Sequence, residues 1–145
     1  MPSFYYKIKL PCPSLDVYNL LKDVSSFNTF MNSVKKIDVL KKENNIMNVR
    51  WNVDFDGVPI EWTEEMLFDD KLYNIKFKSL TGDYNRRGQW NIYQSQESTN
   101  TYVSLEMTYD WNVPNFEYFF GDIYNEKAEK ATKGMLYSLK KRITK

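Results

Sequence analysis

The sequence contains no histidine and only one cysteine, Cys12. Without histidine, the chain has no imidazole to act as a general base, to bind zinc or to complete a catalytic triad. A single cysteine excludes an internal disulfide and a thiol cluster for a metal, and we expect it to be inert. Any chemistry must therefore use carboxylates, tyrosine, arginine, lysine or water, and we expect no metal and no cofactor.

The chain also lacks an excess of charge and a long apolar run. It has 20 Lys+Arg against 19 Asp+Glu, a net charge of +1, so we expect no nucleic-acid partner, because such proteins normally carry a strongly basic surface. No apolar run approaches the ~20 residues of a membrane-spanning helix, and residues 1–10 do not resemble a secretion signal. These absences predict a soluble, cytoplasmic protein.

Aromatic residues are what the sequence has in excess, at 17% of the chain. A chain of 145 residues has the usual size of one domain and can bury a real core, so we expect residues 1–145 to form a single domain. The rings either fill a solid core or line a binding site, and composition alone leaves both readings open.

The last thirty residues, 115–145, have the pattern of one long amphipathic helix. Apolar side chains recur every three or four residues, which places them on one face; they are Phe116, Phe120, Tyr124, Ala128, Ala131, Met135, Leu139 and Ile143, widened by Phe119, Ile123 and Leu136. Pro114 and Asn115 are a typical helix start. Gly134 inside the helix costs ~1 kcal/mol relative to alanine, which predicts a packing or functional reason for it.

The rest of the chain reads as strands with two short helices between the first and the second. Ser3–Leu10 alternates like a half-buried strand, the short helices follow at 15–22 and 25–31, and six strands joined by tight turns then run from Val34 to Trp111. Consecutive hairpins form an antiparallel sheet with one dry face. We therefore predict an α+β fold in which a curved sheet of about seven strands surrounds the long helix; the alternative is a closed barrel with the helix outside.

This order of elements resembles the helix-grip superfamily (START-like, SRPBCC), and within it the polyketide cyclase/aromatase-like proteins. The positions that carry the resemblance are 24–31, 34–40, Trp51 with Gly57, 62–65, 75–77 with Gly82 and Asp83, 88–90, and Pro114 before the final helix. The resemblance implies a cavity between sheet and helix that binds a hydrophobic molecule. Where those cyclases often have an inward arginine and a tyrosine, this chain has Met66 and Val34, so binding is better supported than catalysis.

Glu64 is the candidate catalytic residue. It alternates with Trp62 and Met66, so a regular strand places its carboxylate on the dry face, where an acid either takes up a proton or finds a charged partner. The alternatives are a bulge between Glu64 and Glu65 that returns both carboxylates to solvent, or a position of Glu64 at the mouth of the cavity.

Arg86 and Arg87 begin a later strand, and alternation puts one of them on the side of Trp90. That arginine either holds an anionic group of a ligand or lies in solvent at a hairpin. Together with Phe116, the residues that we expect to line the ligand site are Trp51, Trp62, Met66, Phe77, Arg86, Trp90, Met107, Tyr109, Phe120, Tyr124 and Met135.

Three functions fit these patterns. The first is binding of a hydrophobic, aromatic or polyketide-like molecule, as in a carrier of a polyketide, quinone or lipid. The second is cyclase/aromatase chemistry in the same cavity, with Glu64 or a tyrosine moving a proton. The third is a protein-interaction module without a ligand. We expect a monomer or a homodimer.

Overall fold

A computed structural model describes residues 2–113 and 116–144, and the side chains of these residues except 116–119. The strands are β1 (Ser3–Leu10), β2 (Val34–Glu43), β3 (Ile46–Phe55), β4 (Val58–Asp69), β5 (Asn74–Gly82), β6 (Tyr84–Gln94) and β7 (Thr101–Trp111). The helices are α1 (Ser14–Lys22), the 3-10 turn η1 (Val24–Ser26), α2 (Phe27–Phe30) and α3 (Phe116–Ile143). The predicted order of elements is confirmed.

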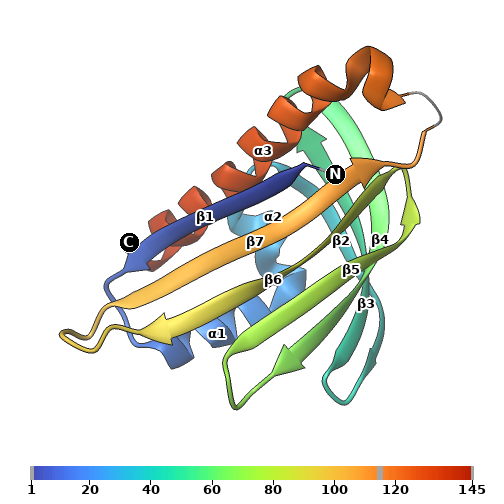
Figure 1. The fold of residues 1–145 in the computed structure, drawn as a ribbon. Coiled ribbons are helices and arrows are strands. Elements are labelled where there is room, and N and C mark those ends of the chain that lie inside the picture. The colour runs from blue at the N-terminus through green and yellow to red at the C-terminus, as the bar shows by residue number, and fades with distance from the viewer. Residues whose placement is uncertain (1, 114–115, 145) are drawn as a thin grey trace.

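The seven strands form one antiparallel sheet in the order β1-β7-β6-β5-β4-β3-β2. The sheet curves around α3, and the short helices lie on the same side as α3 (Figure 1). Its edge strands β1 and β2 do not pair with each other, so the sheet is open and the closed-barrel alternative is wrong. Helix α3 packs mainly against β1, β3 and β7.

The core lies between the concave face of the sheet and the helices. In β3, buried Met47, Val49, Trp51, Val53 and Phe55 alternate with more exposed residues, as expected of a strand with one dry face. Small residues of α3, namely Ala128, Ala131 and Thr132, are buried, which lets the helix approach the sheet closely.

A close approach of two strands explains Gly88. A Cβ at Gly88 would lie 2.1 Å from the carbonyl oxygen of Glu106 and 2.7 Å from Cα of Met107. Because both atoms belong to the backbone of β7, no side-chain adjustment relieves the clash. Gly88 is therefore required where β6 presses against β7.

Helix α3 departs from the predicted pattern in three places. Phe120 and Ile123 are 52% and 56% exposed, so the expectation that they join the buried face is wrong. A Cβ at Gly134 would meet nothing within 4 Å, so this glycine has no packing reason. The predicted start signal at Pro114 and Asn115, and the side chains of Phe116 and Phe119, lie outside the described residues.

Two smaller points complete the fold. Helix α1 begins at Ser14, with Pro13 at its N-cap position and no side-chain capping bond. No helix within the described ranges combines the length and the apolar character needed to cross a membrane.

Candidate functional site

Glu64 lies on the concave face at the middle of β4 and is fully buried. The register between β4 and β5 shifts between Thr63 and Glu64, so that Glu64 is opposite Ser79 while Thr63 is opposite Thr81. The irregular residue is thus Leu80 of β5, which is exposed. The alternative in which a bulge returns Glu64 to solvent is wrong, because the bulge lies in the neighbouring strand.

Arg86 of β6 reaches across β5 to Glu64. Its Nε donates to Glu64 Oε1 at 2.6 Å and its Nη2 donates to Oε2 at 3.1 Å, the two-pronged geometry in which a guanidinium binds a carboxylate most specifically. Arg86 is only 3% exposed. The alternative of a solvated hairpin arginine is therefore wrong for Arg86, whereas Arg87 is exposed.

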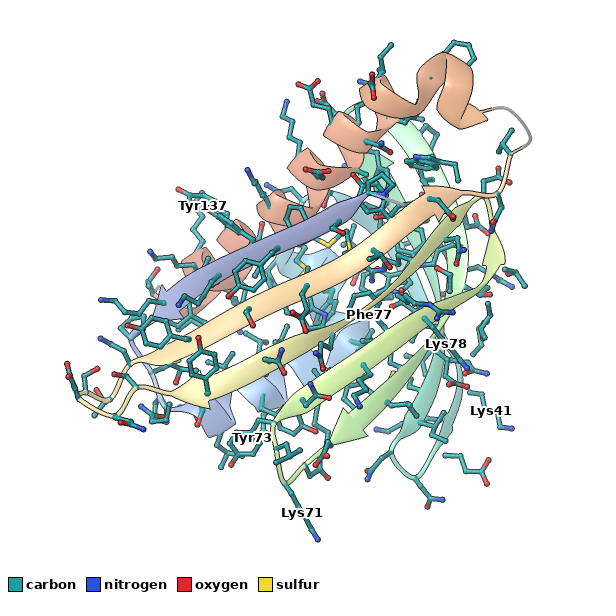
Figure 2. All side chains as sticks on the ribbon, in the orientation of Figure 1. Lys41, Lys71, Tyr73, Phe77, Lys78 and Tyr137 are labelled. Carbon is teal, nitrogen blue, oxygen red and sulfur yellow. The ribbon has the colours of Figure 1, made fainter. Side chains whose placement is uncertain are left out.

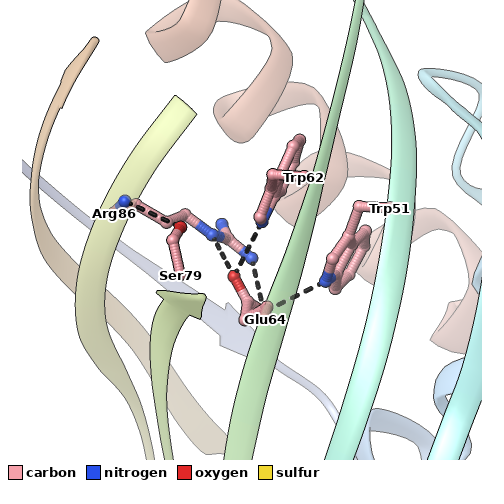
Figure 3. Close-up of polar contacts among 5 residues, drawn as sticks. All are labelled: Trp51, Trp62, Glu64, Ser79 and Arg86. Carbon is pink, nitrogen blue, oxygen red and sulfur yellow. Dashed lines mark hydrogen bonds and ion pairs between the residues drawn. The ribbon is translucent and has the colours of Figure 1, made fainter. Parts of the chain in front are cut away.

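Two indole rings complete the binding of the carboxylate. Trp51 Nε1 donates to Oε2 and Trp62 Nε1 donates to Oε1, each at 3.1 Å, as Figure 3 shows. The rings of Trp51 and Trp62 lie almost parallel, with an interplanar angle of 8° and centroids 5.7 Å apart. Opposite positions on β3 and β4 bring them together, since Trp51 pairs with Trp62 in the register.

The guanidinium of Arg86 is packed between aromatic rings. Its Cζ lies 4.3 Å from the centroid of Phe77, 5.2 Å from that of Trp62 and 5.4 Å from that of Trp51. Cation–π contacts of this kind are strongest away from water. The backbone amide of Arg86 donates to Ser79 Oγ at 2.9 Å, which fastens β6 to β5 beyond the last paired residues, Lys78 and Arg87.

This geometry limits what Glu64 can do chemically. Four donors point at its two oxygens, and a carboxylate offers about four lone-pair sites. The ionised form is therefore the one that fits its surroundings, and no acceptor site is left for a proton of a substrate. The arrangement favours a positioning role for Glu64 over proton transfer, and its catalytic role stays a prediction.

Arg86, by contrast, has donors to spare. A guanidinium carries five N–H groups, and Glu64 uses one on Nε and one on Nη2. Its Nη1 makes no hydrogen bond to another described residue. Nη1 is therefore a donor inside the aromatic wall that the bond to Glu64 leaves unused.

Tyr84 is a site residue that the sequence reasoning missed. It is 1% exposed, its hydroxyl has no partner among the described residues, and its ring lies 5.0 Å from that of Trp62. Burial raises the pKa of Tyr84, and Glu64 and Glu129 add to this while Arg86 opposes it. Alternation along β6 places Tyr84, Arg86 and Trp90 on one face, a signal that was open to sequence reasoning.

The structure brings most of the predicted lining residues to the interior. Nine of them are buried on the concave side or on α3: Trp51, Trp62, Met66, Phe77, Arg86, Trp90, Met107, Tyr109 and Met135. Tyr124 is half-buried, with its ring 5.8 Å from that of Trp111. The exposed position of Phe120 removes it from the expected lining.

A second polar cluster links β7 to α3. The hydroxyl of Tyr109 donates to the carboxylate of Glu129, and Trp111 Nε1 donates to Asn125 Oδ1 at 2.9 Å. Rings fill the space between the two clusters: Tyr84 contacts Trp111 and Phe55 at centroid distances of 5.0 and 5.1 Å. The interior is thus aromatic, with polar groups at two defined places.

Two hollows lined by described residues open on the surface, away from the interior between the sheet and α3. One, of about 940 Å³, lies on the convex face over β1 and β4 to β7. The other, of about 300 Å³, lies between α1 and the hairpin of β2 and β3. Neither opens between the sheet and α3, where the cavity was expected.

Comparisons with known proteins agree with this architecture. Residues 10–136 match the family described as polyketide cyclase / dehydrase and lipid transport. A comparison with curated proteins gives no significant match.

Solved structures show the same fold at low sequence identity. A protein from Thermus thermophilus is 24% identical, with a TM-score of 0.90 over 99% of this chain and 97% of that chain. The Zhui aromatase/cyclase from a Streptomyces species is 17% identical, with a TM-score of 0.85 over 99% and 93%. A STAR-related lipid transfer protein from Xanthomonas axonopodis is 14% identical, with a TM-score of 0.77 over 99% and 86%.

These structural matches show the fold alone, because the identities are low. The family match is broader evidence, since it spans most of the sequence. The chain has the helix-grip architecture, and it belongs to the polyketide cyclase / dehydrase and lipid transport family.

Proposed function

We propose that this protein binds a hydrophobic, aromatic or polyketide-like small molecule between the concave face of the sheet and α3. The observation that carries the proposal is the unused Nη1 group of Arg86, which is held among aromatic rings by the bond of the guanidinium to Glu64. Ligand sites are typically apolar with a few precisely placed polar groups. A rigid donor in an aromatic wall fits that description.

The charge of the cluster favours a neutral guest. Glu64 already balances the charge of Arg86, so an anionic ligand would lose its hydration without meeting a net positive charge. A carbonyl or quinone oxygen only needs a donor, which Arg86 Nη1 supplies. We therefore expect flat molecules with carbonyl groups to bind more tightly than fatty acids.

The same geometry supports a carrier more than an acid–base enzyme, since Glu64 has no free lone pair for a proton. Cyclase/aromatase activity remains a second candidate, favoured by the unpaired hydroxyl of Tyr84 close to Arg86 and by the aromatase/cyclase among the structural relatives. In this reading Tyr84 gives or takes the proton during aldol closure.

Binding is tested by native mass spectrometry of the purified protein and by titration with a naphthoquinone, followed by tryptophan emission. All four indole rings, those of Trp51, Trp62, Trp90 and Trp111, are buried, so a guest in the interior should quench them with saturation. The absence of both a bound guest and saturable quenching would reject binding and leave the protein-interaction module.

The role of Arg86 is tested by Arg86→Lys, which keeps the charge but loses the planar fork. We expect the affinity for the quinone to fall about fivefold or more. The matched control is Arg50→Lys, because Arg50 is exposed and its contact with Glu61 is a loose one of 3.8 Å. An equal effect of both substitutions would contradict the assigned anchor.

The enzyme candidate is tested with a linear polyketone as substrate and the Tyr84→Phe variant. Loss of turnover with an affinity within a few fold of the wild type would support it. Turnover unaffected by Tyr84→Phe, or no turnover by the wild type, would reject Tyr84 as its proton donor and leave the carrier.

A further inference from the structure

A groove of about 940 Å³ crosses the convex face of the sheet, opposite the core. It follows a row of directly paired residues, Phe4, Met107, Gly88 and Phe77, on four neighbouring strands, and its walls are the outward side chains on either side of that row. Its volume is in the range of small-molecule sites. Phe77 and Met107 also belong to the predicted interior lining, but their side chains are buried; the outward side chains that form the walls of the groove belong to no part of the proposed interior site.

Three cations meet where the groove crosses β5 and β6. Lys78 is directly opposite Arg87, and Lys76 is two residues from Lys78 on the same face. Like charges opposite each other destabilise a sheet, so the stability of the fold does not account for this arrangement. Figure 2 shows Lys78 midway along β5.

These cations have few acidic partners. Lys78 contacts Glu65 at 3.8 Å, and Lys76 and Arg87 form no ion pair with any other described residue. The other acid of the groove, Glu106, accepts a hydrogen bond from Gln89. Lys76 and Arg87 lie diagonally across the pair of strands β5 and β6, close enough to bind one anion together.

An apolar path leads away from the cations. Leu67 of β4 lines the groove and is directly opposite Lys76, and Ile46 of β3, directly opposite Leu67, lies just beyond the groove lining. Both are exposed, at 40% and 45%. From β6 to β3 the path crosses three strand spacings, roughly 14 Å, about the length of a ten-carbon chain.

We propose that this groove binds a small amphipathic anion, with its carboxylate between Arg87 and Lys76 and its apolar chain over Leu67 and Ile46. The two cationic groups supply charge-assisted hydrogen bonds to a carboxylate, which are stronger than those to an uncharged head and which a quaternary ammonium head cannot accept. The aliphatic part of the Lys76 side chain covers the start of the chain, as long cationic side chains commonly do on apolar surface.

The test is a titration of isotope-labelled protein with sodium decanoate below its micelle concentration, followed by amide and indole N–H shifts. We expect saturable shifts at the amides of Lys76, Arg87 and Leu67 and none at the indoles of Trp51 and Trp62. Decyltrimethylammonium, with the same chain and the opposite charge, should bind about tenfold more weakly or worse.

Two double variants distinguish binding in the groove from a general effect of the protein's positive charge on the affinity. Lys76→Gln with Arg87→Gln should weaken decanoate binding about tenfold or more, and Leu67→Ser should weaken it by a few fold. The matched control is Lys41→Gln with Lys71→Gln, which removes the same charge at two lysines outside the groove (Figure 2) and should change the affinity by less than about twofold.

The proposal would be overturned by equal binding of the two amphiphiles, by equal affinity in the two double variants, or by binding to anionic phospholipid vesicles without binding of monomeric decanoate. Shifts confined to the indoles would place decanoate in the interior. That result would refute the groove while leaving interior binding intact, so the two proposals can fail separately.

Discussion

Removing the charge of Glu64 should destabilise the fold far more than a surface substitution does. Glu64 is fully buried and accepts four hydrogen bonds, from both indoles and from two nitrogens of Arg86. In Glu64→Gln, one carboxylate oxygen becomes an amide NH₂ that faces donors instead of accepting from them. Two hydrogen bonds are lost, and Arg86 keeps a buried, unpaired charge.

The magnitude follows from these two losses. Breaking a buried ion pair by removing one partner costs about 3 to 5 kcal/mol, a large part of the roughly 5 to 15 kcal/mol that holds a typical domain folded. With a urea dependence of about 2 kcal/mol per molar for a small domain, a loss of about 4 kcal/mol shifts the unfolding midpoint by about 2 M. Urea unfolding followed by tryptophan emission measures it directly.

A double-mutant cycle shows whether the loss belongs to the pair. Arg86→Met alone leaves a buried carboxylate with only two indole donors, and we expect it to cost about as much as Glu64→Gln. The double variant carries no buried charge, so it should be more stable than the sum of the single effects predicts, by about 2 kcal/mol or more. Additive effects, or a loss below about 1 kcal/mol for Glu64→Gln, would refute the reasoning.

Three further predictions concern single residues. Gly134→Ala should stabilise the protein by up to about 1 kcal/mol, because an added methyl meets nothing within 4 Å and alanine favours the helix. Gly88→Ala should cost about 1 to 3 kcal/mol or more, because its Cβ would meet the backbone of β7. The urea midpoints of the two variants test both predictions. Tyr84→Phe should leave stability at pH 7 unchanged or raise it, because the hydroxyl it removes has no partner among the described residues. Burial raises the pKa of Tyr84, so the folded state holds the hydroxyl proton more tightly than the unfolded state. The free energy of unfolding of the wild type should therefore fall as the pH rises above about 10, and that of Tyr84→Phe should fall less. Equal losses of stability in the two proteins between pH 9 and about pH 11 would contradict this.

Sequence periodicity was sufficient to predict the sheet and the face of the sheet on which Glu64 lies. Alternation in β3 and β4 places Trp51, Trp62 and Glu64 on the dry face, and the structure confirms this. The partner of Glu64 was beyond such reasoning. Arg86 is 22 residues away on a strand that is not adjacent to β4, so the contact depends on the irregular residue in β5 and on the end of the pairing between β5 and β6.

The errors in α3 have a different cause. A repeat of three and four residues indicates which side chains share a face of the helix, but not how far along the helix the sheet extends. Ala128, Met135 and Leu139 meet the core, whereas Phe120 and Ile123 are more than half exposed. Tyr84 was missed, although its position two residues before Arg86 marks it as inward-facing.

The interior has a rigid part and an adaptable part, a division that the proposed binding of a guest in a tightly packed core requires. Glu64, Arg86 and the two indoles fix one another through four hydrogen bonds. The other inward-facing residues include Met66, Met107 and Met135, whose unbranched side chains repack easily into new shapes. Specificity would then come from the fixed cluster and space from the methionines, with no movement of the sheet. A guest bound in this way stabilises the folded state by about 2.7 kcal/mol at a free concentration of about 100 times its dissociation constant, so its binding should raise the unfolding temperature with little change in the backbone signals of β3 and β4.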